Sequence, residues 1–133
     1  MSVRARKTKG SSIVETAAGL ILLIPIVLFL VDVAAMVVAQ TENDKLAKAC
    51  ARAAAEFPSS NPGQQSSAAM GVYNNQRRSS LLTPTSLNTT NGGGLVTCAT
   101  TITCTLPVPV PFLGNSSVAF NAKATEPIVG ELP

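Results

Sequence analysis

The sequence predicts an α+β protein in which a long N-terminal transmembrane helix continues into a small extracytoplasmic domain with a short antiparallel sheet. Three observations predict this fold class. Residues 17–39 form a nearly unbroken apolar run, helix-favouring sequence continues to residue 57, and residues 95–106 alternate as a strand does. With 133 residues in all, the chain has room for one small domain beside its anchor.

The first ten residues predict the orientation of the anchor. Four basic side chains precede the apolar run, namely Arg4, Arg6, Lys7 and Lys9. The formal charge of the chain is +3, but beyond residue 10 six basic residues stand against seven acidic ones. The basic character therefore belongs to a leader at residues 1–10, and no nucleic-acid partner is expected. By the positive-inside rule, the leader stays in the cytoplasm and the chain beyond Gln40 lies outside the inner membrane.

The apolar run is long enough to cross a bilayer. Of its residues, all but Gly19, Pro25 and Asp32 are aliphatic, Met or Phe. At a rise of 1.5 Å per residue the run spans about 35 Å, against about 30 Å for a hydrocarbon core. The same pattern is compatible with a signal peptide cut near Ala39, which would release a secreted domain, and with an anchor that keeps its leader.

Helical sequence continues beyond the predicted membrane segment. Apolar residues recur at spacings of four, three and four, in the order Leu46, Cys50, Ala53 and Phe57. This spacing predicts one narrow apolar face, and the proline that follows ends the helix. We expect one continuous helix over residues 11–57, roughly 70 Å long, with its first half in lipid.

The remaining residues, 58–133, are assigned to the β-rich domain. Up to residue 94, its composition is dominated by Ser, Thr, Asn, Gln, Gly and Pro, which is typical of loops, although residues 64–80 leave room for a short helix. The three glycines at 92–94 are interpreted as a flexible break.

Two segments of this domain are predicted to be strands. Residues 95–106 are rich in β-branched side chains, and residues 117–125 alternate with Val118 and Phe120 on one face. Between them, prolines at every second position allow only an edge or an extended arm, and Gly114-Asn115 forms a turn. The economical arrangement is a small antiparallel sheet packed on the apolar face of the helix.

The chain carries three cysteines, and two of them are close in sequence. If the chain turns between Cys98 and Cys104, these two can form a hairpin disulfide, which we favour in an oxidising compartment. If residues 95–106 instead form one straight strand, the two Cα atoms lie about 20 Å apart, beyond the limit of about 7 Å for a bridge. Cys50, on the apolar face of the helix, is expected to be a buried thiol.

The composition argues against catalysis. The chain has no histidine, which excludes a Ser-His arrangement and any imidazole ligand for a metal ion. Its seven acidic residues are scattered, and the glycines at 92–94 precede a strand and not the helix that a phosphate-binding loop requires. We expect no enzymatic activity, no catalytic or metal-binding residues, no cofactor and no small-molecule substrate.

One acidic side chain stands near the start of the predicted membrane segment. A carboxylate in hydrocarbon costs about 2.5–3.5 kcal/mol or more, so Glu15 needs a partner. Cleavage after Gly10 would supply one, because the freed α-amine of Ser11 lies four residues earlier on the same helical face. The pair can form within one chain or between neighbouring chains. Asp32, near the outer end of the run, is a second candidate for an assembly contact.

This N-terminal pattern resembles the class III signal of the type IV pilin superfamily, and most closely that of TadE/TadG-like pseudopilins of tight adherence (Flp) pilus systems. The resemblance covers residues 9 to 40. It is carried by Gly10-Ser11, Val14-Glu15, Ala17, the Leu/Ile-rich run with Pro25, and Asp32. Thr16 departs from the pattern, which has Phe or Tyr at this position.

The resemblance implies a processing step, a function and a location. A membrane aspartyl prepilin peptidase would cut after Gly10. The mature chain would be a minor or initiating subunit in pilus assembly, held by one span in a bacterial inner membrane and partnered by other pilin or pseudopilin subunits and the assembly machinery. The rival hypothesis is a single-span adhesin or envelope-complex scaffold, which would keep residues 1–10.

Overall fold

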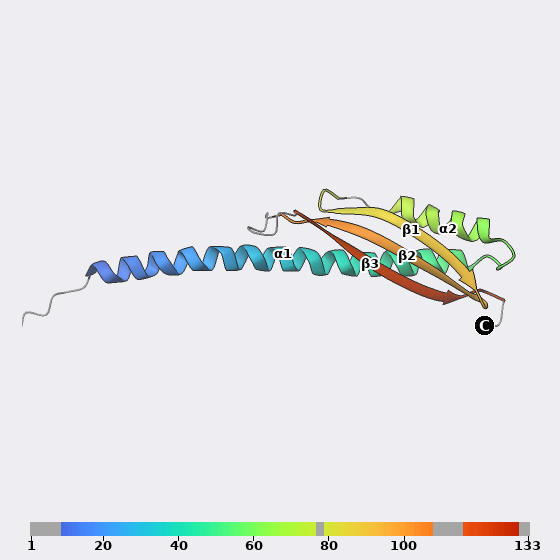
Figure 1. Cartoon of the computed structure of the whole chain (residues 1–133), viewed down its shortest axis with the longest axis horizontal. Helices are drawn as coiled ribbons and strands as arrows, with labels where there is room; N and C mark the ends of the chain where they lie inside the picture. Colours follow the sequence, from blue (N-terminus) through green and yellow to red (C-terminus); the bar gives the residue numbers. More distant parts are fainter. Residues whose placement is uncertain (1–8, 77–78, 108–115, 131–133) are drawn as a thin grey trace, which may run out of the picture.

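The computed structural model describes residues 9–76, 79–107 and 116–130. In this part of the chain, two helices are followed by three strands: α1 (Lys9–Ala55), α2 (Pro62–Asn75), β1 (Leu82–Gly92), β2 (Leu95–Thr105) and β3 (Ser117–Pro127). The first half of α1 projects away from a small domain, in which α2 and the sheet lie along its second half (Figure 1). The predicted α+β class is confirmed. The leader up to residue 8, the prolines at 109 and 111 and the expected turn at Gly114-Asn115 lie outside the described residues.

α1 is one helix of 47 residues that continues through Pro25. Its bounds lie within two residues of the predicted range, 11–57. From Ser12 to Val31 every residue is exposed, and burial begins at Asp32. The helix therefore has two parts with different surroundings, a bare segment (residues 12–31) and a covered segment (residues 32–55).

The covered segment of α1 lies against both the sheet and α2. Its buried residues follow helical spacing, and they are Asp32, Ala39, Asn43, Leu46, Ala47, Cys50, Ala51, Ala54 and Ala55. The predicted apolar face is correct at Leu46 and Cys50, whereas Ala53 and Phe57 are half-buried. The covered face is wider than predicted because the sheet packs on one side of it and α2 on the other. The alanines allow this, since helix packing distance depends on the size of the side chains at the contact.

The three strands form one antiparallel sheet in the order β1-β2-β3. Every second side chain of the central strand β2 is buried against the helices, namely Val96, Cys98, Thr100, Ile102 and Cys104. This confirms the strand predicted at residues 95–106 from its period of two. The strand predicted at residues 117–125 is β3, with Val118 and Phe120 on its half-buried face.

β1 lies in the segment that composition predicts to be loops. It pairs with β2 from Leu82 opposite Cys104 to Gly92 opposite Leu95. Gly93 and Gly94 turn the chain with φ angles of 59° and 72°, a region that L side chains avoid. Two residues of positive φ between paired strands are characteristic of a type I′ hairpin, so the glycines form a defined turn and not a flexible break.

β1 also tolerates a proline because it is an edge strand. Pro84 lies where the pairing with β2 shifts register at a bulge. A proline removes one backbone donor, which is harmless at an edge or bulge. The same two features reduce the tendency of this edge to pair with another chain.

α2 occupies much of the range 64–80, where the sequence allowed a short helix. It begins earlier, at Pro62, because proline suits the first turn of a helix, where its missing N–H is not needed. Its buried residues Gln65, Ala69 and Tyr73 recur every four positions. The Gln65 amide donates to the Phe57 carbonyl at 2.8 Å and accepts from the Asn91 amide at 3.0 Å, which joins the start of α2 to the turn after α1 and to β1.

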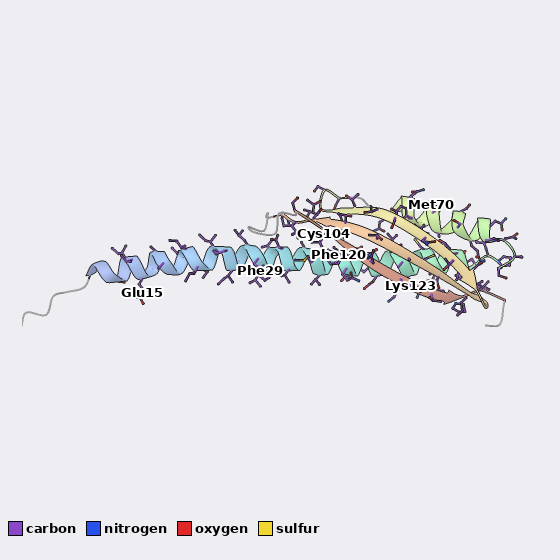
Figure 2. All side chains as sticks on the ribbon, viewed as in Figure 1. Glu15, Phe29, Met70, Cys104, Phe120 and Lys123 are labelled. Atoms are coloured by element: carbon purple, nitrogen blue, oxygen red, sulfur yellow. The ribbon has the colours of Figure 1, made fainter. Side chains whose placement is uncertain are left out.

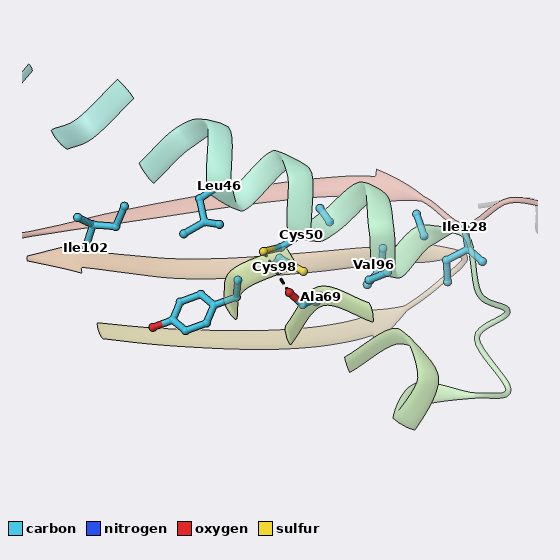
Figure 3. Packing of buried hydrophobic residues seen from close by; sticks show 11 residues of the cluster. Leu46, Cys50, Ala69, Val96, Cys98, Ile102 and Ile128 are labelled. Atoms are coloured by element: carbon cyan, nitrogen blue, oxygen red, sulfur yellow. Dashed lines mark hydrogen bonds between the residues drawn. The ribbon is translucent and has the colours of Figure 1, made fainter. Parts of the chain in front are cut away.

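One hydrophobic cluster holds the two helices and the sheet together (Figure 3). Its labelled members are Leu46, Cys50, Ala69, Val96, Cys98, Ile102 and Ile128. Ile128 closes the end of the cluster, because its N–H donates to the Gly94 carbonyl at 2.8 Å and the next N–H, of Val129, donates to the Ala55 carbonyl at 2.9 Å. Most members of the cluster have small side chains, so the apolar core is small. The hydrogen bonds at its ends contribute to its stability.

Candidate membrane-anchor and assembly surface

The bare segment of α1 is a continuous apolar surface. Its large side chains are widely exposed, for example Ile21 at 69% and Leu30 at 58%. At 1.5 Å per residue the segment is about 30 Å long, which matches a hydrocarbon core. In the described part of the chain, α1 is the one helix long and apolar enough to cross a membrane, and its most apolar window has a mean hydropathy of 2.9. The structure is thus compatible with a single-pass anchor.

The bare segment does not coincide with the predicted apolar run. The run covers residues 17–39, but the domain covers Asp32 and Ala39, so the last third of it is partly buried in protein. Toward the N-terminus, the described exposed residues extend to Ser12. An anchor that uses this segment therefore includes Glu15.

Glu15 is exposed on the bare segment (Figure 2). Among the described residues it forms no ion pair. The predicted cleavage pair, Gly10 and Ser11, lies in the first turn of α1, and Ser11 precedes Glu15 by four residues. The Thr16 hydroxyl, at the position that departs from the pilin pattern, donates to the Ser12 carbonyl at 2.9 Å, so this polar group is satisfied inside the helix.

Asp32 lies in a different environment. It is 2% exposed, at the level where the domain begins to cover α1. Burial raises the pKa of the Cys104 thiol, and the charge of the Asp32 carboxylate raises it further. Of the two carboxylates predicted to make contacts between chains, Glu15 is therefore on the open surface, and Asp32 faces its own domain.

Asn43 is a structural site that the sequence analysis missed. It is fully buried, and its Nδ2 donates to the Phe120 carbonyl at 2.7 Å and the Thr100 carbonyl at 3.3 Å. The Thr100 hydroxyl donates to Asn43 Oδ1 at 2.7 Å. One side chain thus joins α1 to both β2 and β3 and sets their relative position. The sequence could have revealed the buried position of Asn43 by its spacing, since Asn43 lies three residues before Leu46 on the same face of α1.

The predicted Cys98–Cys104 disulfide is wrong. β2 is unbroken from Leu95 to Thr105, so these two cysteines lie on one face of a straight strand, about 20 Å apart. Both are free buried thiols, and so is Cys50, as predicted. The chain does not turn between Cys98 and Cys104, because the turn that forms the hairpin lies at Gly93-Gly94 and the β-branched alternation continues to residue 105.

The Cys98 thiol predicts a dependence of stability on pH. Burial raises the pKa of this thiol above its ordinary value of 9.0, and the hydrogen bond with the Thr89 hydroxyl, which lowers it, is the smaller effect. The stability that the protonated thiol contributes is fully present below pH 9 and is lost as the pH rises through the folded-state pKa. In urea unfolding at increasing pH, we expect the free energy of unfolding to fall above pH 9, and less steeply for Cys98→Ala. An equal fall in both proteins would contradict this.

The fold and this surface define a class of protein, an α+β chain whose one long helix is bare and apolar in its first part and buried in a three-stranded domain in its second. In the described residues, no three Cys, Asp or Glu side chains come together as a metal ion would require. A comparison with models of known protein families finds no match, and searches of curated proteins and of solved structures find none either. The function is therefore inferred from the residues of this chain.

Proposed function

We propose that this chain is a non-catalytic pilin-like subunit, held in a bacterial inner membrane by α1, that acts in the assembly of a tight adherence pilus. The observation that carries the proposal is the division of α1 into a bare apolar segment about 30 Å long and a segment buried in a folded domain. Such a helix serves as a membrane anchor and then as a surface that packs against the same helix of neighbouring subunits. The N-terminal resemblance to TadE/TadG-like pseudopilins supports the same function.

Polar and small residues on the bare segment support the assembly role. In lipid, no hydrophobic force drives helices together, so association depends on close packing of small residues and on polar pairs. Ala17, Ala18 and Gly19 provide a place for close approach, and a Cβ added at Gly19 would meet no atom within 4 Å. Glu15 lies beside them, and cleavage after Gly10 would place the α-amine of the new N-terminus one turn away from it.

The outer face of the sheet supports an aqueous location for the domain. Hydroxyl and amide side chains pair across the strands, with Thr85 bonded to Thr103, Thr97 to Thr125 and Thr101 to Asn121, each at 2.8 Å. Such a face suits water and not lipid. Together with the basic leader, it favours a cytoplasmic N-terminus and an extracytoplasmic domain.

The test of this proposal is the N-terminus of the mature protein. We expect protein purified from membranes of cells that contain a prepilin peptidase to begin at Ser11, and protein from cells without the peptidase to retain residues 1–10. Mass spectrometry of the intact chain distinguishes the two. A chain that begins at Met1 or Ser2 in the presence of the peptidase would eliminate the processed subunit and leave the single-span adhesin or scaffold. A start beyond Ala39 would instead reveal a signal peptide.

A further inference from the structure

An apolar cavity lies between α1 and the segment that leads into β1, at the end of the domain nearest to the bare segment. Its volume is about 360 Å³. The lining includes Ala34, Ala35 and Val38 from α1, Ser79 and Leu81 from the segment before β1, and Cys104 from the end of β2. Cavities that bind small apolar molecules have volumes of about 300–1,000 Å³, so this one is large enough for a ligand.

The cavity lies just beyond the part of α1 that fits a hydrocarbon core. Ala34 and Val38 are three and seven residues past Val31, which corresponds to about 5–10 Å along the helix. The headgroup layer of a bilayer extends about 5–8 Å from the edge of the hydrocarbon, so the cavity lies at the outer surface of the membrane. Val37 and Val38 are 61% and 54% exposed, so apolar surface continues from the bare segment to the cavity.

A more polar recess adjoins the cavity on the side away from the bare segment. Its volume is about 200 Å³, and it shares Ser79 and Leu82 with the cavity. Glu42 and Gln76 supply its polar wall. The Lys45 ammonium, which lies outside the recess, donates to the Glu42 carboxylate at 2.7 Å and neutralises its charge. Along the helix axis, the apolar cavity is thus followed by a smaller recess that has one charged residue, Glu42, in its wall.

We propose that the cavity holds part of an acyl chain of one phospholipid from the outward-facing leaflet. This inference rests on the proposed membrane anchorage. The apolar lining of the cavity, its position close to the membrane and the continuity of its surface with the bare segment favour a lipid as the occupant. Bound there, the lipid fills the gap between domain and bilayer and holds the domain at a defined height.

The experiment uses tryptophan fluorescence of the full chain in phosphatidylcholine vesicles whose acyl chains carry bromine, a short-range quencher. The chain has no tryptophan, so one introduced residue reports its own surroundings. Leu81→Trp places the reporter at the cavity, Phe29→Trp in the bare segment (Figure 2) and Val129→Trp at the opposite end of the domain. We expect Leu81→Trp and Phe29→Trp to lose fluorescence and Val129→Trp to keep it.

A second substitution shows whether the lipid is inside the cavity. Ala35→Leu fills part of it, and we expect this change to restore the fluorescence of Leu81→Trp while Phe29→Trp stays quenched.

If Phe29→Trp is quenched but Leu81→Trp is not, the lipid site is wrong and the membrane anchor stands. If neither is quenched, both proposals fail. If Leu81→Trp stays quenched in the presence of Ala35→Leu, the tryptophan contacts bulk lipid outside the cavity. If its fluorescence changes with the protein-to-lipid ratio in vesicles without bromine, a second copy of the chain covers this site. Either result overturns the lipid site.

Discussion

Asn43→Asp is expected to lower the free energy of unfolding by roughly 3–5 kcal/mol, the cost of an uncompensated buried charge. The side chain is fully buried, and its Nδ2 donates to the carbonyl oxygens of Phe120 and Thr100. A carboxylate there would place a negative oxygen against both carbonyls. Because domains are stable by only about 5–15 kcal/mol, we expect much of this one to unfold. Urea unfolding in detergent micelles, followed by the fluorescence of the single tyrosine, Tyr73, measures the change.

The neighbouring residue provides a matched control. Asp44→Asn makes the reverse change on an exposed side chain that accepts a hydrogen bond from Gln40 at 3.1 Å. Its effect should stay within about 0.5 kcal/mol, as for most surface substitutions. Acid should partly restore the Asn43→Asp variant, because a protonated carboxyl can donate one of the two lost hydrogen bonds. Equal losses in the two variants would show that Asn43 does not hold the helix to the sheet.

Glu15→Ala is expected to abolish most assembly while the chain still inserts and folds. A carboxylate in hydrocarbon is unfavourable, so we expect its removal to leave insertion unchanged. The domain begins at Asp32, so its stability should not change either. On the proposed function, the variant loses the polar pair that guides helices together in lipid, and repeated over many subunits we expect at least about a tenfold drop in assembled protein. Immunoblots of sheared surface fractions and of membranes measure assembly and insertion separately.

Two further variants separate charge from shape. Glu15→Gln keeps the size of the side chain without its charge and should fail as the alanine variant does. Asp44→Ala removes an exposed carboxylate from the covered segment of α1, outside the anchor, and should assemble normally. Normal assembly of both Glu15 variants would remove the role proposed for this carboxylate. A loss of insertion in either would show that it acts before assembly.

Much of the fold follows from local sequence. Helix propensity and the lack of a stop signal predict α1 to within two residues of its observed ends, even with a proline at 25. A period of two predicts β2 and β3. β1 is missed because nearly all its side chains are polar, and its strand state comes from pairing with β2 across a turn that two glycines make possible. Hydrophobic periodicity cannot reveal a strand of that kind.

The sequence predicts those features of the candidate site that depend on which residues are present. It does not predict the features that depend on contacts between distant parts of the chain. Glu15 stands out because a charge in an apolar run is costly wherever the chain folds. Asp32 stands out for the same reason, but its sequence does not show that the domain covers it. The apolar cavity has no sequence signature, because it is lined by α1, β2 and the segment that leads into β1, which are far apart in the chain.

The sequence alone predicts an apolar helix, two alternating strands and a carboxylate near the start of the apolar segment, since these follow from the order of neighbouring residues. The tertiary structure decided that the helix is covered from Asp32 onward, that Asn43 joins it to two strands, and that Cys98 and Cys104 remain thiols. The physical reason is that burial, hydrogen-bond partners and the distance between two sulfurs depend on residues brought together by the fold, not on those adjacent in the chain.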